Sequence, residues 1–388
     1  MLAMATATAE DYGISPPLRL HMVYAFLAME PPDVVISLAR DFGCGSLDDR
    51  VQSCIWRQCI CKADVKLQGP YLKRFLKKLI LEIESDGEDV LDELYERYAF
   101  YLTSLQDNDV DKGNSRILKS ISFLFSDESS GLVSCPKSRN LEVQLQCSLN
   151  LLEGDTGCSL WPSSIFMSEF ILSFPEIFVN KCCFEVGSGV GLVGICVAHV
   201  KASKVILSDG DLSALANMKV NLELNHLTTN TCTIDDHGVC HSMVQCVCLP
   251  WESASKEDLR GFAPDIILGA DVIYNPSCLP HLVRVLATLL RPGSSLQNER
   301  RFNHSLQEKV TSNGSPASEI LGHPSANGPV AFFTSVIRNI KTFDYFLALA
   351  TKADLVVMDI TEKVEIFEFL PYLRSYPRLN VRIFKIYL

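Results

Sequence analysis

The feature that most constrains the fold of this chain is an alternation of short apolar runs and helical segments that begins near residue 182. Cys182–Val186 is a predicted strand and Leu192–His199 a predicted helix. Further strands are expected at Lys204–Leu207, Val244–Leu249, Asp265–Ala270, Val330–Val336, Leu355–Ile360 and Val381–Leu388, and further helices at Leu212–Leu224, Leu279–Leu290 and Phe343–Ala353. This order predicts an α/β fold with a doubly wound, mostly parallel sheet covered on both faces. No helical pattern separates the last two strands, so an antiparallel final strand is expected.

The residues before this alternation are of a different kind. Residues 14–105 place apolar side chains at helical spacing and predict an N-terminal helical region. Residues 117–180 begin with β-branched runs separated by turn residues, which favour a small β-hairpin region, and continue to a helix at Ile165–Phe174. Residues 181–388 form the α/β domain, in which the polar stretch 293–328 predicts a disordered insertion.

Composition excludes several classes of protein. The formal net charge of -11 argues against direct binding of nucleic acid, which needs a basic surface. No apolar run approaches the ~20 residues that span a bilayer, so no membrane association is expected. The start of the chain lacks the basic segment of a secretory signal, and a cytoplasmic location with reduced thiols is expected. Five cysteines lie in apolar runs and are interpreted as small buried hydrophobic residues: Cys182, Cys183, Cys196, Cys246 and Cys248.

The segment 184–192, Phe-Glu-Val-Gly-Ser-Gly-Val-Gly-Leu, joins the first strand of the alternation to its first helix. Read from Gly189, it matches the dinucleotide fingerprint Gly-x-Gly-x-x-Gly. Because the strand ends at Val186, the tight turn begins at Gly187, and Glu185 then stands two residues before the loop. A carboxylate there suits a cationic amino-acid ligand better than a pyrophosphate. The candidate ligand-binding loop is Gly187, Ser188 and Gly189, whose backbone can approach a ligand closely.

Two residues after the next strands are candidates for contacts to a nucleoside. Asp209 lies about 20 residues past the glycine turn, where an acid accepts hydrogen bonds from both ribose hydroxyls. The simpler interpretation is a helix N-cap, for which Asp211 is the better placed residue. Trp251 follows the third strand and could cover an adenine face, or could simply pack in the core.

A second polar pair follows the strand that ends at Ala270. Asp271-Val272-Ile273-Tyr274 places a carboxylate and a phenol at a strand end, and both groups can hydrogen-bond an amine. The small Ala270 leaves room for a flat ligand. A strand-end cap with a packed tyrosine is the alternative. Gly157-Cys158-Ser159-Leu160-Trp161 precedes the glycine loop by one helix, so Trp161 either covers the ligand or packs beside a loop.

These motifs resemble those of a known enzyme group. The loop with Glu185 resembles motif I of S-adenosylmethionine-dependent methyltransferases, and Asp271-x-x-Tyr274 is similar to the signature of seven-β-strand protein-lysine methyltransferases. Leu76–Ile80 followed by Leu91–Glu96 looks like the N-terminal region of the elongation factor 2 lysine methyltransferase type, the family with sequence similarity 86. Val336-Ile337-Arg338-Asn339 is a looser match to a Val-Arg-Asn run of that family.

The resemblance implies a seven-strand Rossmann-like methyltransferase fold, S-adenosyl-L-methionine as cofactor and a protein partner, elongation factor 2. It implies that Asp271 and Tyr274 are the catalytic pair around the target lysine. It also implies a cofactor site formed by Trp161, Glu185, Gly187, Ser188, Gly189, Asp209, Trp251 and Ala270. No metal is required for this reaction.

Other interpretations remain open from the residues alone. A methyltransferase of RNA or of a small molecule is one, although the Asp-x-x-Tyr motif counts against it. A nicotinamide-dependent dehydrogenase would use the Gly189 register, and a non-catalytic scaffold would only bind cofactor and partner. Two weaker signals are a zinc site in the polar segment 227–241, with Cys232, His237, Cys240 and His241, and a docking face at the basic stretch Lys73–Lys78.

Overall fold

The computed structural model of the chain describes residues 16–63, 65–104, 116–125, 140–148, 156–228, 243–291 and 328–388. The predicted insertions at 227–241 and 293–328 lie outside these residues, apart from their ends, and so do the four candidate zinc ligands. The chain divides into two compact units. Unit 1 comprises Met1–Phe123 with Leu370–Ser375, and unit 2 comprises Leu124–Phe369 with Tyr376–Leu388.

Unit 1 is helical where it is described. Its elements are α1 (Pro16–Leu27), α2 (Pro32–Phe42), α3 (Asp49–Gln58), the 3-10 helix η1 (Ile60–Lys62), α4 (Val65–Ser85), α5 (Asp92–Ser104) and most of strand β1 (Arg116–Leu124). Helix α4 runs through Pro70, at the loss of one backbone hydrogen bond.

A segment far away in the sequence completes unit 1. The hydroxyl of Tyr372 donates to the carbonyl of Ser122 at 2.9 Å and accepts from its N–H at 2.8 Å. Arg374 donates to the carboxylate of Asp41 at 2.7 Å. These bonds hold Leu370–Ser375 on the helical unit, although the residues that flank it in sequence belong to unit 2.

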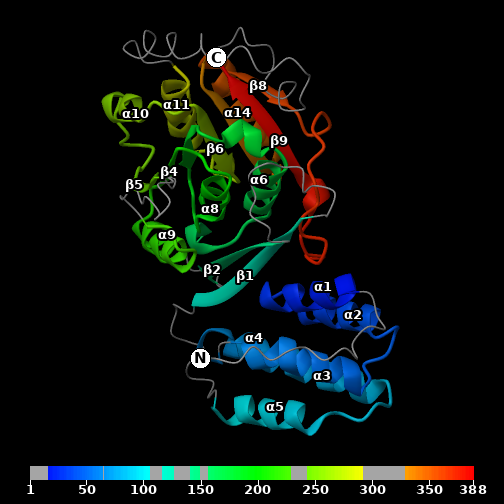
Figure 1. Cartoon of the computed structure of the whole chain (residues 1–388). Helices are drawn as coiled ribbons and strands as arrows, with labels where there is room; N and C mark the ends of the chain where they lie inside the picture. The colour runs from blue at the N-terminus through cyan, green and yellow to red at the C-terminus, as the bar shows by residue number, and fades with distance from the viewer. Residues whose placement is uncertain are drawn as a thin grey trace. The chain divides into compact units, whose positions relative to one another are not determined.

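Unit 2 contains a seven-stranded sheet with the order β5-β4-β3-β6-β7-β9-β8 (Figure 1). Its strands are β3 (Cys182–Val186), β4 (Lys204–Asp209), β5 (Met243–Cys248), β6 (Ile266–Ala270), β7 (Val330–Val336), β8 (Val356–Asp359) and β9 (Val381–Tyr387). Strands β3 to β7 pair in parallel, and β9 pairs antiparallel with both β7 and β8. The predicted doubly wound sheet and its antiparallel final strand are confirmed.

Helices cover both faces of this sheet. On one face lie α6 (Pro162–Ser173), α8 (Leu192–His199) and α9 (Leu212–Leu224), and on the other α10 (Lys256–Phe262), α11 (Leu279–Leu289) and α14 (Ile340–Lys352) (Figure 1). Alternate strand residues serve each face, as the two-residue period of a strand requires. Phe333 packs in the core of the α11 face, whereas Phe332 meets Phe170 of α6 with ring centroids 5.1 Å apart.

Strand β2 (Asn140–Ser148) is held to unit 2 by asparagines of α9. Asn221 accepts from the N–H of Gln146 at 2.7 Å, and Asn225 both accepts from and donates to the backbone of Gln144 at 3.0 and 2.7 Å. These amides serve as hydrogen-bond partners for backbone groups of β2 on the side that faces α9. The asparagine side chains of α9 therefore stabilise the position of β2 in the fold.

Candidate active site

The candidate residues gather at the carboxyl edge of the sheet. Strands β3, β4 and β6 are parallel, so the segments that follow them emerge at the same edge. The chain leaves β3 for β4 on one side, while β6 lies on the other side. In open α/β sheets, such a reversal of strand order marks the crevice in which ligands bind.

The glycine loop between β3 and α8 has a shape that side chains would disrupt. Gly187 and Gly189 have φ angles of +66° and +54°. A Cβ at Gly187 would lie 2.9 Å from Val272 Cγ1, and one at Gly189 would lie 3.0 Å from the carbonyl oxygen of Gly157. Gly157 belongs to the segment before Trp161, so that segment lies directly on the glycine loop.

Glu185 is buried beneath this loop at the end of β3. Its Oε2 atom has no hydrogen-bond partner among the described residues. Burial raises the pKa of this carboxyl to about 8, and the nearby charge of Asp209 adds to the rise. A buried carboxylate oxygen without a partner is costly, and a cationic group in the crevice would satisfy it.

Asp209 joins the end of β4 to the same loop. Its Oδ2 accepts from the backbone N–H of Gly189 at 3.0 Å, and its Oδ1 accepts from that of Asp211 at 3.0 Å. Burial raises the pKa of Asp209. Asp211, and not Asp209, caps α9, by accepting from the N–H of Ala214 at 2.9 Å. Each carboxylate oxygen of Asp209 keeps a lone pair with which it can accept a further hydrogen bond.

Trp251 and Ala270 border the loop from neighbouring strands. The indole of Trp251 lies against Gly187, with its Cζ2 3.5 Å from the position of a Cβ there. The same side chain also packs on the core that contains Phe184, as the simpler interpretation of this residue expects. Ala270 is the last residue of β6 and pairs with Thr334 of β7.

Asp271 makes the most extensive set of polar contacts at this edge. Its backbone has φ +56°, an unusual value for a residue with a side chain, and its N–H donates to Thr334 O at 2.9 Å. Its carboxylate accepts two parallel hydrogen bonds from Arg338, at 3.0 and 2.9 Å. The Asp271 side chain is only 6% exposed, whereas that of Arg338 is 46% exposed.

Arg338 links this carboxylate to residues 157–161, the covering segment, which lies on the glycine loop. Its guanidinium carbon lies 5.4 Å from the ring centroid of Trp161, a cation–π distance. The indole N–H of Trp161 in turn donates to the carbonyl of Thr156 at 2.9 Å. Sequence reasoning missed this role of Arg338. The available signal is the Val-Ile-Arg-Asn run that begins at the last residue of β7, but this run matches the family pattern only loosely.

Tyr274 is placed differently from its predicted partner. It lies three residues after Asp271, but its side chain is 61% exposed. The structure therefore brings Trp161, Asp271 and Arg338 into one cluster, and Glu185, Asp209 and Gly189 into another. Tyr274 stands at the open side of the same sheet edge.

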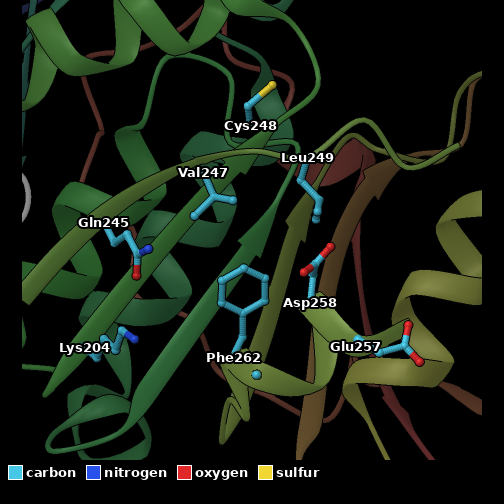
Figure 2. A pocket seen from close by; sticks show the side chains of 9 residues that line it. Lys204, Gln245, Val247, Cys248, Leu249, Glu257, Asp258 and Phe262 are labelled. Atoms are coloured by element: carbon cyan, nitrogen blue, oxygen red, sulfur yellow. The ribbon is translucent and has the colours of Figure 1, made fainter. Parts of the chain in front are cut away.

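A groove of about 570 Å³ lies elsewhere on unit 2, beside the edge strand β5 (Figure 2). Val247 and Cys248 of β5 and Asp258 and Phe262 of α10 are among its lining residues. None of the candidate site residues lines it.

The prediction that Cys248 is buried was wrong, because β5 is an edge strand and its last residue faces outward. Cys183 and Cys196 are buried as expected.

Within the described part of the chain, His, Cys, Asp and Glu side chains form no group that could hold a metal ion. None of the helices described has both the length and the apolar character of a bilayer span.

Comparisons with known proteins agree with the sequence motifs. Residues 139–309 match the model of the lysine methyltransferase family. Human protein-lysine N-methyltransferase EEF2KMT is 29% identical over 223 residues, which are 56% of this chain and 60% of the human protein. Protein-lysine N-methyltransferase EFM3 of Chaetomium thermophilum is 28% identical over 273 residues, 66% of this chain and 76% of that protein.

A longer match is to an uncharacterized protein of Dictyostelium discoideum, 28% identical over 338 residues, which are 82% of this chain and 81% of that protein. The chain spans about 60% of the length of the human and mouse relatives that it matches. The resemblance to seven-strand protein-lysine methyltransferases, inferred from the sequence motifs, is confirmed.

Proposed function

We propose that this chain is a protein-lysine N-methyltransferase that uses S-adenosyl-L-methionine, because residues 139–309 match the model of the lysine methyltransferase family. The observation that carries the proposal is the meeting of two clusters at one sheet edge. One is a glycine loop with a buried, unsatisfied carboxylate oxygen on Glu185, and the other is the strand-end carboxylate of Asp271.

The residues of the first cluster fit S-adenosylmethionine by their chemistry. Glu185 offers an anionic oxygen for the ammonium of the methionine part, and Asp209 offers acceptors for ribose hydroxyls. The bare backbone of Gly187, Ser188 and Gly189 permits close approach. Three more residues complete the proposed site. The flat indoles of Trp161 and Trp251 would cover the ligand, and the small Ala270 would leave room for it.

When bound, S-adenosylmethionine supplies a methyl group on a sulfonium, which a neutral lysine amine can take by in-line displacement. The protein contributes placement and electrostatics, and alignment of two bound reactants can lower a barrier by about 7–11 kcal/mol. Asp271 orients the target amine through a free lone pair of its carboxylate. Tyr274, exposed at the open side, contacts the incoming lysine and limits the entrance.

Elongation factor 2 is the protein substrate that we propose, because the N-terminal motifs resemble that methyltransferase type. The relative named EEF2KMT supports this proposal. A cytoplasmic location is part of the same proposal.

The test uses the full chain, tritiated S-adenosylmethionine and an extract of cells from which this enzyme has been deleted, with mass spectrometry of labelled proteins. We expect label on a lysine of elongation factor 2 with the wild-type chain. Asp271→Ala should lose transfer yet retain cofactor affinity in calorimetry. Label on RNA or on a small molecule would replace the proposed substrate class, and undiminished transfer by Asp271→Ala would remove that residue from the mechanism.

A further inference from the structure

The ion pair between Asp271 and Arg338 has an asymmetry that bears on the proposed reaction. The carboxylate is almost fully buried, while the guanidinium reaches the surface and lies on the Trp161 ring. The two parallel hydrogen bonds of 2.9 and 3.0 Å fix the geometry of the pair. Asp271 thus enters the site already neutralised by a cation of this chain.

A neutralised carboxylate has a different effect on a lysine than an unpaired one. The amine must be neutral to attack, yet the pKa of a free lysine is about 10.4. An unpaired carboxylate within ~4–6 Å would stabilise the ammonium and oppose the loss of its proton. A carboxylate paired with Arg338 can still accept one N–H bond from the amine, but it adds no net negative charge.

Resting on the proposed function, we propose that Arg338 is a positioning residue that cancels the charge of Asp271, so that the target lysine loses its proton at neutral pH. The proton passes to solvent water, and the nitrogen lone pair then forms the new bond to carbon. In this arrangement Asp271 directs the amine without holding it as an ammonium.

The other groups at this edge do not provide this cancellation. Glu185 ends β3 and Asp209 ends β4, and both are acids. Tyr274 follows β6, and the covering segment and the start of α6 contribute Trp161 and Ser163, which carry no charge. Lys341, in the first turn of α14, is the nearest lysine in sequence to Arg338, and its side chain is exposed.

The experiment measures kcat for methylation of elongation factor 2, at saturating substrate and cofactor, between about pH 6 and pH 10, because kcat reports the pKa values of groups in the enzyme–substrate complex. In Arg338→Met, the acidic limb of the profile should shift to a higher pH by about one to three units. The unpaired carboxylate would then stabilise the ammonium form of the target lysine. At neutral pH this corresponds to a loss of about 10- to 1000-fold. Arg338→Lys keeps the positive charge, so its limb should stay in place while looser geometry lowers the rate.

The double variant Asp271→Asn with Arg338→Met removes both charges, and its limb should return to the wild-type position. It also removes the buried unpaired carboxylate, so it keeps the test valid if Arg338→Met alone folds poorly. Arg382→Met, which breaks an exposed pair with Asp359, is the matched control and should leave the profile unchanged. Cofactor affinity by calorimetry confirms the folding of each variant.

An unchanged limb in Arg338→Met, with only a lower rate, would overturn the charge-cancelling role and leave the proposed function intact. A displaced limb that persists in the double variant would also overturn it. A wild-type chain that methylates no lysine in the extract experiment would overturn both the inference and the function on which it rests.

Discussion

The carboxylate of Asp209 accepts a hydrogen bond of 3.0 Å from the backbone N–H of Gly189, and so ties the end of β4 to the loop after β3. Both residues belong to the proposed cofactor site. The bond presents Asp209 to a ribose and holds the loop in its positive-φ shape at the same time.

Asp209→Ala should therefore weaken S-adenosylmethionine binding by about 10-fold or more, because a hydrogen bond to a charged group contributes about 1.5–3 kcal/mol. Asp211→Ala is the matched control two residues away. It removes the α9 cap and should cost about 1 kcal/mol of unfolding free energy without this loss of affinity. Calorimetry and thermal melts separate the two effects. Equal cofactor affinity in both variants would contradict the assignment of Asp209.

Glu185→Gln should change the pH dependence of stability. The pKa of Glu185 is raised from 4.5 to about 8 in the folded chain, so the native state holds a proton that the unfolded chain loses near pH 4.5. The resulting stability is fully present below that pH and is lost as pH rises towards 8. The variant stays neutral and should exceed the wild type at pH 8 by about 1–3 kcal/mol in the absence of cofactor.

The two proteins should converge below about pH 4.5, where the Glu185 side chain is neutral in the folded and in the unfolded chain. The same variant should bind S-adenosylmethionine more weakly at pH 8, because it has lost the anion. Chemical denaturation at several pH values checks the first effect and calorimetry the second. A constant stability difference between pH 5 and pH 8 would contradict the raised pKa.

Gly189→Ala should distort the backbone of the glycine loop that would contact the proposed cofactor. Its φ of +54° costs an alanine about 1–2 kcal/mol, and the new Cβ would lie 3.0 Å from Gly157 O. Gly261→Ala is the control, because its Cβ would meet open space within α10 and should stabilise that helix by about 0.5–1 kcal/mol. We expect cofactor binding to fall only in the first variant, as measured by calorimetry; an unaffected Gly189→Ala would argue against close approach of a ligand there.

Arg378→Met should destabilise unit 2 strongly. The fully buried carboxylate of Glu169 in α6 accepts from Arg378 Nε at 2.9 Å, from Phe369 N at 3.0 Å and from the Tyr376 hydroxyl at 3.2 Å. Burial raises the pKa of Glu169, and the charge of Arg378 opposes that rise. Loss of the cation leaves a buried charge unpaired, which costs about 3–5 kcal/mol.

The same substitution at the exposed pair of Arg382 and Asp359 should cost at most about 1 kcal/mol. Urea unfolding of both variants measures the difference. Similar losses in the two would show that Glu169 is not the residue that secures the segment before β9.

Local residue order determined much of this protein. The strand predicted at Val330–Val336 has those same bounds in the structure, and β3 and α8 also match. The periods of apolar residues and the glycine turn are properties of consecutive residues, so they can be read without the fold. One short polar helix was the exception: α10 was missed because few of its residues are apolar, although Ser255 caps it.

The tertiary structure alone decided which side chains share a partner. Arg338 meets Asp271 because β6 and β7 are neighbours in the sheet, and it meets Trp161 because the segment before α6 lies on the glycine loop. The bonds of Glu169 to the residues before β9, and the return of Leu370–Ser375 to unit 1, likewise join positions far apart in the chain. Side-chain pairing at strand ends depends on strand order and on the packing of covering segments, and neither is written in the spacing of neighbouring residues.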